Sequence, residues 1–247
     1  MAPPVKKPYK STLRVAQARA TRRAIVDAAA RLFIKRGYGA TTVDAIAEAA
    51  GVSRKTVFTS VGGKAMALKL AIDWAIVGDD EPVPMLDRPH VRAGMAEPDA
   101  RRMLAAYAAS VREVSERVAP LAMVVQAAAG LDAEIRGLAE DGRAQRLRGM
   151  RVLAQVLADR GALKPGMSAA EAADILWLFN DPAVYHRLVI EQGWPADRYQ
   201  NWLADAFISL LIAPGYRPCP LAGGVRLLNA DLMPEQRRYP VMHDSYR

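Results

Sequence analysis

The sequence predicts an all-α protein, with a small N-terminal unit of three helices followed by a larger helical body. Apolar residues recur every three or four positions in nearly every periodic stretch of the 247 residues, which is helical spacing. The excess of positive charge lies at one end: residues 1–72 have a net charge of +11 and residues 73–247 a net charge of −3. This asymmetry suits a polyanion at the N-terminal end, although a basic end also suits an anionic lipid surface or plain solubility.

Composition excludes several classes of protein. A single cysteine, Cys219, rules out an internal disulfide framework and favours a reducing compartment. No run of residues approaches the roughly 18 apolar residues that span a membrane, and the N-terminus has no signal-like apolar segment. The three histidines have no metal-ligand spacing, and no nucleophile, zinc-protease or phosphate-loop motif occurs. We therefore expect a soluble cytoplasmic protein that is not an enzyme and has no catalytic residue, metal, cofactor or membrane contact.

The first element is a basic arm over residues 1–20, which has five Lys and Arg, no acidic residue and three prolines before position 10. We expect it to be flexible and to grade into a helix. Either it lays cations along a nucleic-acid backbone or it is a solvated tail. From about Thr21 a helix runs to Arg36 with one apolar face, and Gly37 ends it. Tyr38, which follows that glycine, is expected to pack inward.

The next element, over residues 41–64, is two short helices joined at Gly51. A threonine caps the first helix, and Gly51 allows the positive φ that a reversal of the chain needs. Ser53 caps the second helix, whose apolar Val57 faces the first while its basic and hydroxyl residues face outward. This is the layout of a helix-turn-helix with a polar second helix free to enter a major groove. A plain helix hairpin with a buried valine is the alternative.

Residues 21–72 resemble the DNA-binding domain of the TetR (tetracycline-repressor-like) family of transcriptional regulators. The resemblance rests on these residues: Ile25, Ala29, Leu32, Phe33, Gly37, Tyr38, Thr41, Thr42, Val43, Ile46, Ala47, Ala50, Gly51, Val52, Ser53, Thr56, Val57, Phe58 and Lys64. Three positions depart from the family pattern. Phe58 stands where the family often has tyrosine, Val61 where it has an aromatic residue, and Ala65 where it has an acidic residue. Ala65 leaves the start of the fourth helix less well capped.

The resemblance implies a set of DNA contacts that the side-chain chemistry supports. A threonine hydroxyl at the first helix end and Lys64 at the start of the fourth helix suit phosphates, whereas Arg54 and Lys55 suit guanine edges or flanking phosphates. The candidate DNA-contacting residues are Thr41, Thr42, Ser53, Arg54, Lys55, Thr56, Phe58, Thr59 and Lys64.

The rest of the chain is expected to be the helical body. A fourth helix over 64–77 connects it to the DNA-binding domain of residues 21–64, and a long loop with four prolines follows over 78–98. Helical spacing predicts helices over 99–118, 120–130 and 132–160, a capping box that starts a helix at Ser168, and a last helix through Leu211. The body thus spans 78–212, and 213–247 is a C-terminal extension of loop and tail.

Two further sites are expected in the body. An apolar ligand pocket is predicted at Tyr107, Met123, Gln126 and Trp177, with core packing as the alternative for each residue. The wide aromatic stripe of the last two core helices suits a homodimer like that of the TetR family, although an intramolecular core would use it too. The candidate interface residues are Ile175, Leu176, Phe179, Tyr185, Trp202, Phe207 and Leu210.

These features together predict a dimeric DNA-binding transcriptional regulator. We expect it to repress from a near-palindromic operator and to be released when a small-molecule effector occupies the body. Its partners would be double-stranded DNA, a second copy of the chain and that effector. The alternatives are an all-helical ligand-binding or enzymatic bundle with an incidental basic domain, and a sequence-tolerant DNA-binding protein without an inducer.

Overall fold

The computed structural model describes residues 9–218, and the predicted all-α class is confirmed, since no strand occurs in that range. The elements are α1 (Tyr9–Ala40), α2 (Val43–Ala50), α3 (Arg54–Val61), α4 (Lys64–Val77), the 3-10 turn η1 (Met85–Asp87), α5 (Pro89–Ala96), α6 (Ala100–Ala128), α7 (Ala133–Asp159), α8 (Ala169–Phe179), α9 (Pro182–Tyr185), the π-helical turn η2 (His186–Glu191) and α10 (Ala196–Leu211). Most of the C-terminal extension, including Cys219, lies outside the described residues.

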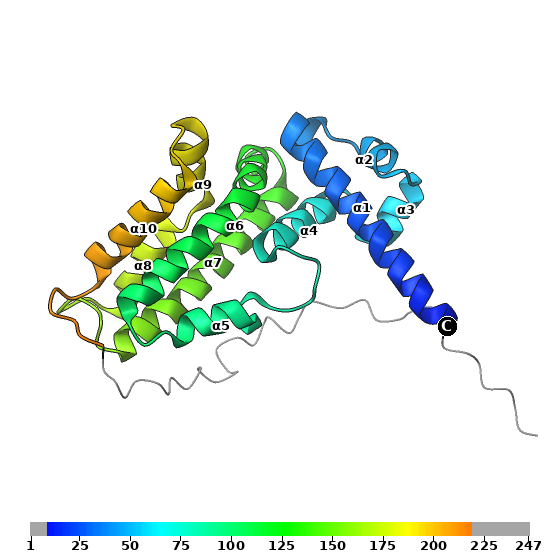
Figure 1. The fold of residues 1–247 in the computed structure, drawn as a ribbon. Coiled ribbons are helices and arrows are strands. Elements are labelled where there is room, and N and C mark those ends of the chain that lie inside the picture. The colour runs from blue at the N-terminus through cyan, green and yellow to red at the C-terminus, as the bar shows by residue number, and fades with distance from the viewer. Residues whose placement is uncertain (1–8, 219–247) are drawn as a thin grey trace, which may run out of the picture.

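The helices form two groups, a head made of α1 to α3 and a body made of α5 to α10 (Figure 1). Helix α4 lies between them and belongs to both, because it packs on α1 and also on α6. No helix within residues 9–218 is long and apolar enough to cross a membrane.

Helix α1 begins earlier than the sequence predicted. It starts at Tyr9 and not near Thr21, so the expected flexible arm over 1–20 is helical from residue 9 onward, and residues 1–8 lie outside the described part. The reason is local: residues 9–24 contain neither glycine nor proline and are rich in alanine and arginine, which favour helix. At the other end Gly37 has φ 77°, which interrupts the helix as predicted. Tyr38 is buried against Phe33 with ring centroids 5.7 Å apart, so its predicted inward packing is confirmed.

The helix-turn-helix forms where the sequence placed it. Thr42 caps α2, with its Oγ1 accepting from the Ala45 amide at 3.1 Å, and Gly51 ends α2 with φ 67°. Ser53 caps α3 by accepting from the Thr56 amide at 3.1 Å. The start of α4 has no side-chain cap, as the missing acidic residue after Lys64 led us to expect.

Two parts of the predicted body differ from the structure. The expected loop over 78–98 contains η1 and α5, and Pro89 occupies the first turn of α5, where a missing N–H costs nothing. The separate helices expected over 99–118 and 120–130 are one helix, α6, with Pro120 inside it. A proline removes one backbone hydrogen bond, but here the packing of both halves keeps α6 continuous.

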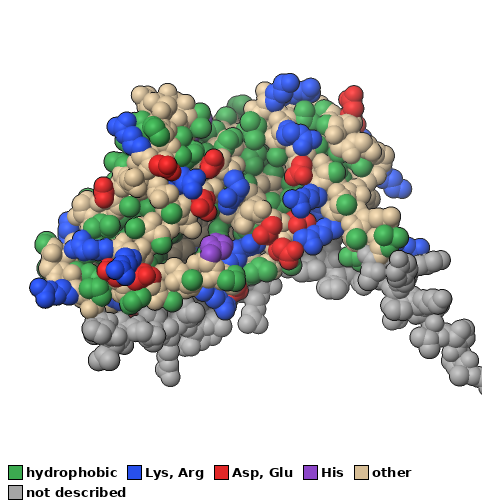
Figure 2. All heavy atoms as spheres, in the orientation of Figure 1, with side chains coloured by type: hydrophobic (Ala, Val, Ile, Leu, Met, Phe, Trp, Pro, Cys, Tyr) green, Lys and Arg blue, Asp and Glu red, His purple; other side chains and the backbone are tan. Residues whose placement is uncertain are grey.

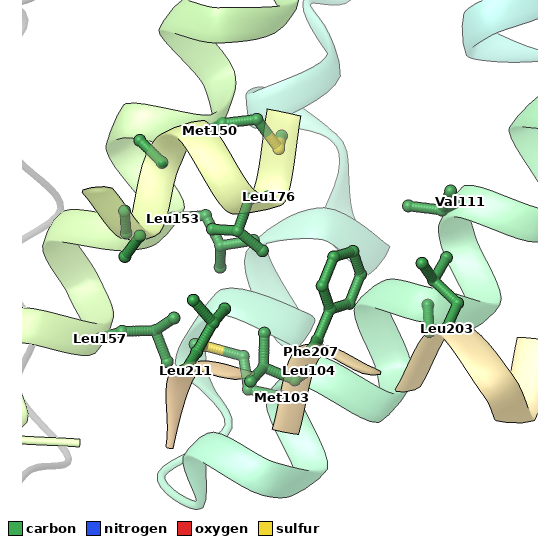
Figure 3. Packing of buried hydrophobic residues seen from close by; sticks show 14 of the residues in the cluster. Met103, Leu104, Val111, Met150, Leu153, Leu157, Leu176, Leu203, Phe207 and Leu211 are labelled. Atoms are coloured by element: carbon green, nitrogen blue, oxygen red, sulfur yellow. The ribbon is translucent and has the colours of Figure 1, made fainter. Parts of the chain in front are cut away.

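The C-terminal half of the body follows the sequence more closely. Ser168 and Glu171 form the predicted capping box at the start of α8. The chain then turns at Asp181, which caps α9, and passes through η2 before α10. Helices α6, α7, α8 and α10 enclose the body core, which Figure 3 shows with Leu104, Leu176 and Phe207 pointing toward one another.

The hydrophobic core of the head includes residues of the body. Residues of α1 to α4 form it together with Leu121, Val125 and Ala128 from the end of α6 and Ile135 from the start of α7. Ile135 is completely buried there. The tip of the α6–α7 hairpin therefore completes the core of the head, which couples the two parts mechanically.

Candidate nucleic-acid interface

The exposed face of α3 carries the residues best placed to meet a partner. Val57 and Val61 are buried against the head, whereas Arg54, Lys55, Phe58 and Thr59 are exposed. The Lys55 side chain makes no ion pair among the described residues. This face fits the major groove of B-DNA, which admits one α-helix.

The hydroxyl residues near the helix-turn-helix have different environments. Thr42 and Ser53 are exposed at the starts of α2 and α3, and Ser53 Oγ lies 2.8 Å from Thr56 Oγ1. Thr59 Oγ1 donates to the Lys55 carbonyl at 3.1 Å and remains exposed. Thr41 is only 1% exposed, and its Oγ1 donates to the Gly37 carbonyl at 2.8 Å. The prediction of Thr41 as a DNA contact is therefore wrong for its side chain, because the bend after α1 uses that hydroxyl.

Arg54 and Phe58 form a group with Asp44 of α2. Nη1 of Arg54 donates to Oδ2 of Asp44 at 2.5 Å, and the guanidinium carbon lies 5.6 Å from the centroid of the Phe58 ring. Phe58 is 47% exposed, and a Cβ added at Gly63 would come within 3.2 Å of its ring. Gly63 has φ 116°, a backbone conformation that favours glycine there.

Lys64 points back toward the end of α1. Its Nζ donates to the Tyr38 carbonyl at 2.9 Å and lies 3.9 Å from the centroid of the Tyr38 ring. Partial burial lowers the pKa of Lys64, and the nearby Asp132 carboxylate opposes that shift. An ammonium group has three N–H donors, so this contact leaves donors for a phosphate at the start of α4.

The predicted ligand pocket does not form. Tyr107 and Met123 lie about 24 Å apart along α6, because each residue of a helix advances the axis by about 1.5 Å. Tyr107 is packed in the body core, where its hydroxyl donates to Met150 Sδ at 3.0 Å, and Trp177 Nε1 donates to the Arg143 carbonyl at 3.3 Å. Gln126 is exposed on α6. The four residues cannot line one cavity.

A cleft of about 430 Å³ lies elsewhere, where the end of α4 meets α5 and α6. Its lining residues are Ile76, Val77, Gly78, Asp79, Met85, His90, Ala106, Ala109, Ser110, Glu113, Val114 and Arg117. A volume of this size suits a small organic molecule. No sequence pattern predicts this cleft, because four of its twelve lining residues come from the segment expected to be a loop.

Arginines hold the end of α4 beside this cleft. Arg117 of α6 donates to the carbonyls of Ala75 and Ile76 at 2.8 and 3.3 Å, which satisfies the open end of the helix. Arg88 donates twice to Asp79, at 2.6 and 2.8 Å, and lowers the pKa of that carboxyl to about 2.

A third arginine ties the same segment to the head. Arg19 of α1 donates to both oxygens of Asp80 at 2.5 and 2.7 Å and to Glu81 at 2.9 Å. Figure 2 shows acidic side chains beside Lys and Arg side chains where the head meets the body. The segment after α4 thus forms ion pairs both with Arg19 of the head and with Arg88, which precedes α5.

The predicted dimer face is only partly available. Leu176, Tyr185 and Phe207 are 0%, 3% and 0% exposed, so they pack within one chain and cannot contact a second copy. Helical spacing marked them as apolar but could not say which partner buries them. Ile175, Phe179 and Trp202 are half-buried and Leu210 is exposed. Leu178 of α8 and Ile190 of η2, both exposed, were not predicted.

The described residues contain no group of three or more potential metal ligands. A basic helix-turn-helix head joined to an all-helical body is the architecture of a DNA-binding regulator.

Comparison with known proteins identifies a family resemblance of the head. Residues 25–65 match the family model of bacterial regulatory proteins of the tetR family. The helix-turn-helix of the head is thus similar to the DNA-binding region of the bacterial regulatory proteins of the tetR family. A search of curated proteins finds no match.

Solved structures have the same fold. NalD of Pseudomonas aeruginosa, the secondary repressor of the MexAB-OprM multidrug efflux pump, matches with a TM-score of 0.62 and 21% identity over 81% of this chain and 100% of that chain. FadR, a fatty acid degradation regulator from Bacillus halodurans, matches with a TM-score of 0.59 and 18% identity over 80% and 97%. The complex of SmeT with triclosan matches with a TM-score of 0.58 and 21% identity over 81% and 95%, and SmeT is the repressor of a Stenotrophomonas maltophilia multidrug efflux pump.

Proposed function

We propose that the chain is a homodimeric cytoplasmic repressor that binds a near-palindromic operator and leaves it when a small organic molecule binds the body. The observation that carries the proposal is the exposed, basic outer face of α3, seated on a buried inner face. The matched tetR family region covers this helix-turn-helix.

The DNA contacts follow from the geometry of the head. Lys55 and Thr59 would reach base edges from the middle of α3, because they are exposed and lie on the same side of the helix. Thr42, Ser53 and Thr56 would meet phosphates at the helix starts, where free amides and the helix dipole favour anions. Lys64 would hold a further phosphate from the start of α4.

A dimer would place two heads on one duplex. The exposed apolar side chains of α8 and α10, Leu178 and Leu210 with the half-buried Ile175, Phe179 and Trp202, support self-association through these helices. Two copies related by a two-fold axis would read half-sites about one helical turn apart or somewhat more, which accounts for a near-palindromic operator.

The effector would bind in the cleft at the end of α4. One wall of the cleft is α4 and the other is α6, and Arg117 joins the two walls. A molecule that separates Arg117 from the α4 carbonyls would release the end of α4 and thereby change the spacing of the two heads. By linkage, such a molecule binds the DNA-free shape more tightly. The triclosan in the SmeT complex supports a small-molecule effector by analogy of fold.

The test is selection of fragments from genomic DNA, followed by anisotropy titrations with the selected duplex and a random duplex at 0.15 M salt. A specific regulator binds its site roughly 1,000-fold or more tightly than random DNA. Equal affinity for both duplexes would indicate a sequence-tolerant DNA-binding protein. The absence of salt-dependent DNA binding would favour a helical bundle with an incidental basic domain.

A further inference from the structure

Helix α3, the helix proposed to enter the major groove, carries one cationic side chain that already has an anionic partner. Arg54 Nη1 lies 2.5 Å from Asp44 Oδ2, and the side chains of Arg54 and Asp44 are 59% and 65% exposed. The guanidinium also lies over the exposed ring of Phe58. Arg54 is therefore drawn across the outer surface of the head between α2 and α3 and does not project freely as Lys55 does.

The helix dipoles of α2 and α3 explain why Arg54 pairs with Asp44. Arg54 is the first residue of α3, where the positive end of the helix dipole disfavours a cation. Asp44 stands in the first turn of α2, where an anion is favoured. The carboxylate thus offsets an unfavourable position of Arg54, and the two side chains together present no net charge to a duplex.

A contact between Arg54 and DNA would require the Arg54–Asp44 ion pair to break. For Arg54 to reach a phosphate or a guanine it must leave Asp44, and the carboxylate then faces the negatively charged duplex without its partner. Two N–H bonds from an arginine to a guanine can discriminate the right base roughly 5- to 150-fold, which offsets that loss. A single phosphate contact on random DNA brings only the release of about one counterion.

We propose that Asp44 is a specificity-determining residue, which holds Arg54 back from nonspecific phosphate contacts and gives it up at the operator. This inference rests on the proposed DNA-binding function. Asp44 weakens binding to random DNA and makes no contact with the operator. Affinity for random DNA is lowered more than affinity for the operator, so the pair raises the ratio between them.

The test is Asp44→Asn, measured by anisotropy with the selected duplex and with a random duplex over a series of salt concentrations. The substitution keeps the size of the side chain and removes its charge, which frees Arg54. For random DNA, the slope of log K against log salt should steepen by about 0.9, and affinity at 0.15 M salt should rise about fivefold. The ratio of operator to random affinity should fall. Unchanged slope and ratio would overturn the proposal.

Two controls separate this effect from a general change of charge. Glu48→Gln removes a charge from the same exposed side of α2, and the Glu48 side chain makes no ion pair among residues 13–218. It should change the affinity for random DNA much less than Asp44→Asn does. In an Arg54→Ala background, Asp44→Asn should add nothing further. An equal rise in Glu48→Gln, or a full rise without Arg54, would refute the role of the pair.

Failure of the proposed function and failure of the Asp44 role would give different results. If the wild-type protein shows no salt-dependent DNA affinity, the proposed function is wrong. If it binds a selected operator but Asp44→Asn leaves the specificity ratio unchanged, only the role of Asp44 is wrong. Because Asp44 is exposed, the folded state should tolerate Asn, and thermal unfolding of each variant checks this.

Discussion

Lys64 is expected to have two separable roles, and replacing it with methionine tests both. Methionine keeps most of the unbranched stem and removes the ammonium group. The variant loses the hydrogen bond to the Tyr38 carbonyl at 2.9 Å and the contact with the Tyr38 ring at 3.9 Å. Together these contacts should stabilise the folded head by about 1–2 kcal/mol, because the site is partly buried. A single phosphate contact should add about fivefold to the DNA affinity at 0.15 M salt.

Thermal unfolding and anisotropy titrations over a salt series measure the two roles independently. Lys64→Met should lower Tm and should weaken binding to operator and random duplexes alike, with a slope of log K against log salt that is shallower by about 0.9. Lys55→Met is the matched control, since the exposed Lys55 has no ion pair in the described chain and should leave Tm unchanged. An unchanged slope in Lys64→Met would refute the phosphate contact and leave Lys64 a purely structural residue.

Three further predictions concern the body. Leu178→Glu places a charge on the exposed apolar face of α8 and should convert the proposed dimer to a monomer in sedimentation at micromolar concentration. Arg88→Gln should remove the main hydrogen bond that lowers the pKa of Asp79 to about 2. The stabilisation from the ionised Asp79 is complete above its unfolded pKa of about 3.9 and is lost as the pH falls toward 2. The Tm difference between wild type and variant should therefore shrink from pH 5 to pH 2. Ala106→Trp should fill part of the cleft and weaken operator binding, as the proposed effector is expected to do.

Each of these predictions has its own control. Leu131→Glu alters the very exposed leucine at the α6–α7 turn and should leave the dimer intact; a Leu178→Glu protein that stays dimeric would exclude this face of α8. A Tm difference that stays constant from pH 5 to pH 2 would contradict the Asp79 pairing. Ala105→Trp changes the neighbouring alanine, which does not line the cleft, and equal effects at both positions would remove the cleft from the mechanism.

The sequence predicted the head well because its signals are local. Thr42, Gly51 and Ser53 cap or end helices through contacts with backbone groups a few residues away, so their roles depend little on the rest of the fold. Thr41 shows the limit of such reasoning. It is as good a cap as Thr42 by residue type, but the bend at Gly37 turns its hydroxyl inward.

The sites in the body could not be predicted in the same way. An apolar stripe at helical spacing shows that a face is buried but not what buries it, and so Leu176 and Phe207 were assigned to a dimer while they pack within one chain. The cleft at the end of α4 depends on α5 and on Arg117, which lie far apart in sequence. Pairings of this kind follow from the tertiary arrangement alone.

The most direct test of sequence reading by α3 is the ratio of affinities for a selected genomic duplex and a random duplex at 0.15 M salt. The ratio is measured for the wild type and for Lys55→Ala. The wild type should prefer the selected duplex roughly 1,000-fold or more. Lys55→Ala should keep its fold and lower that ratio about 5- to 150-fold if Lys55 contacts a guanine edge. A wild-type ratio near one, or a ratio that Lys55→Ala leaves unchanged, would contradict sequence reading by this helix.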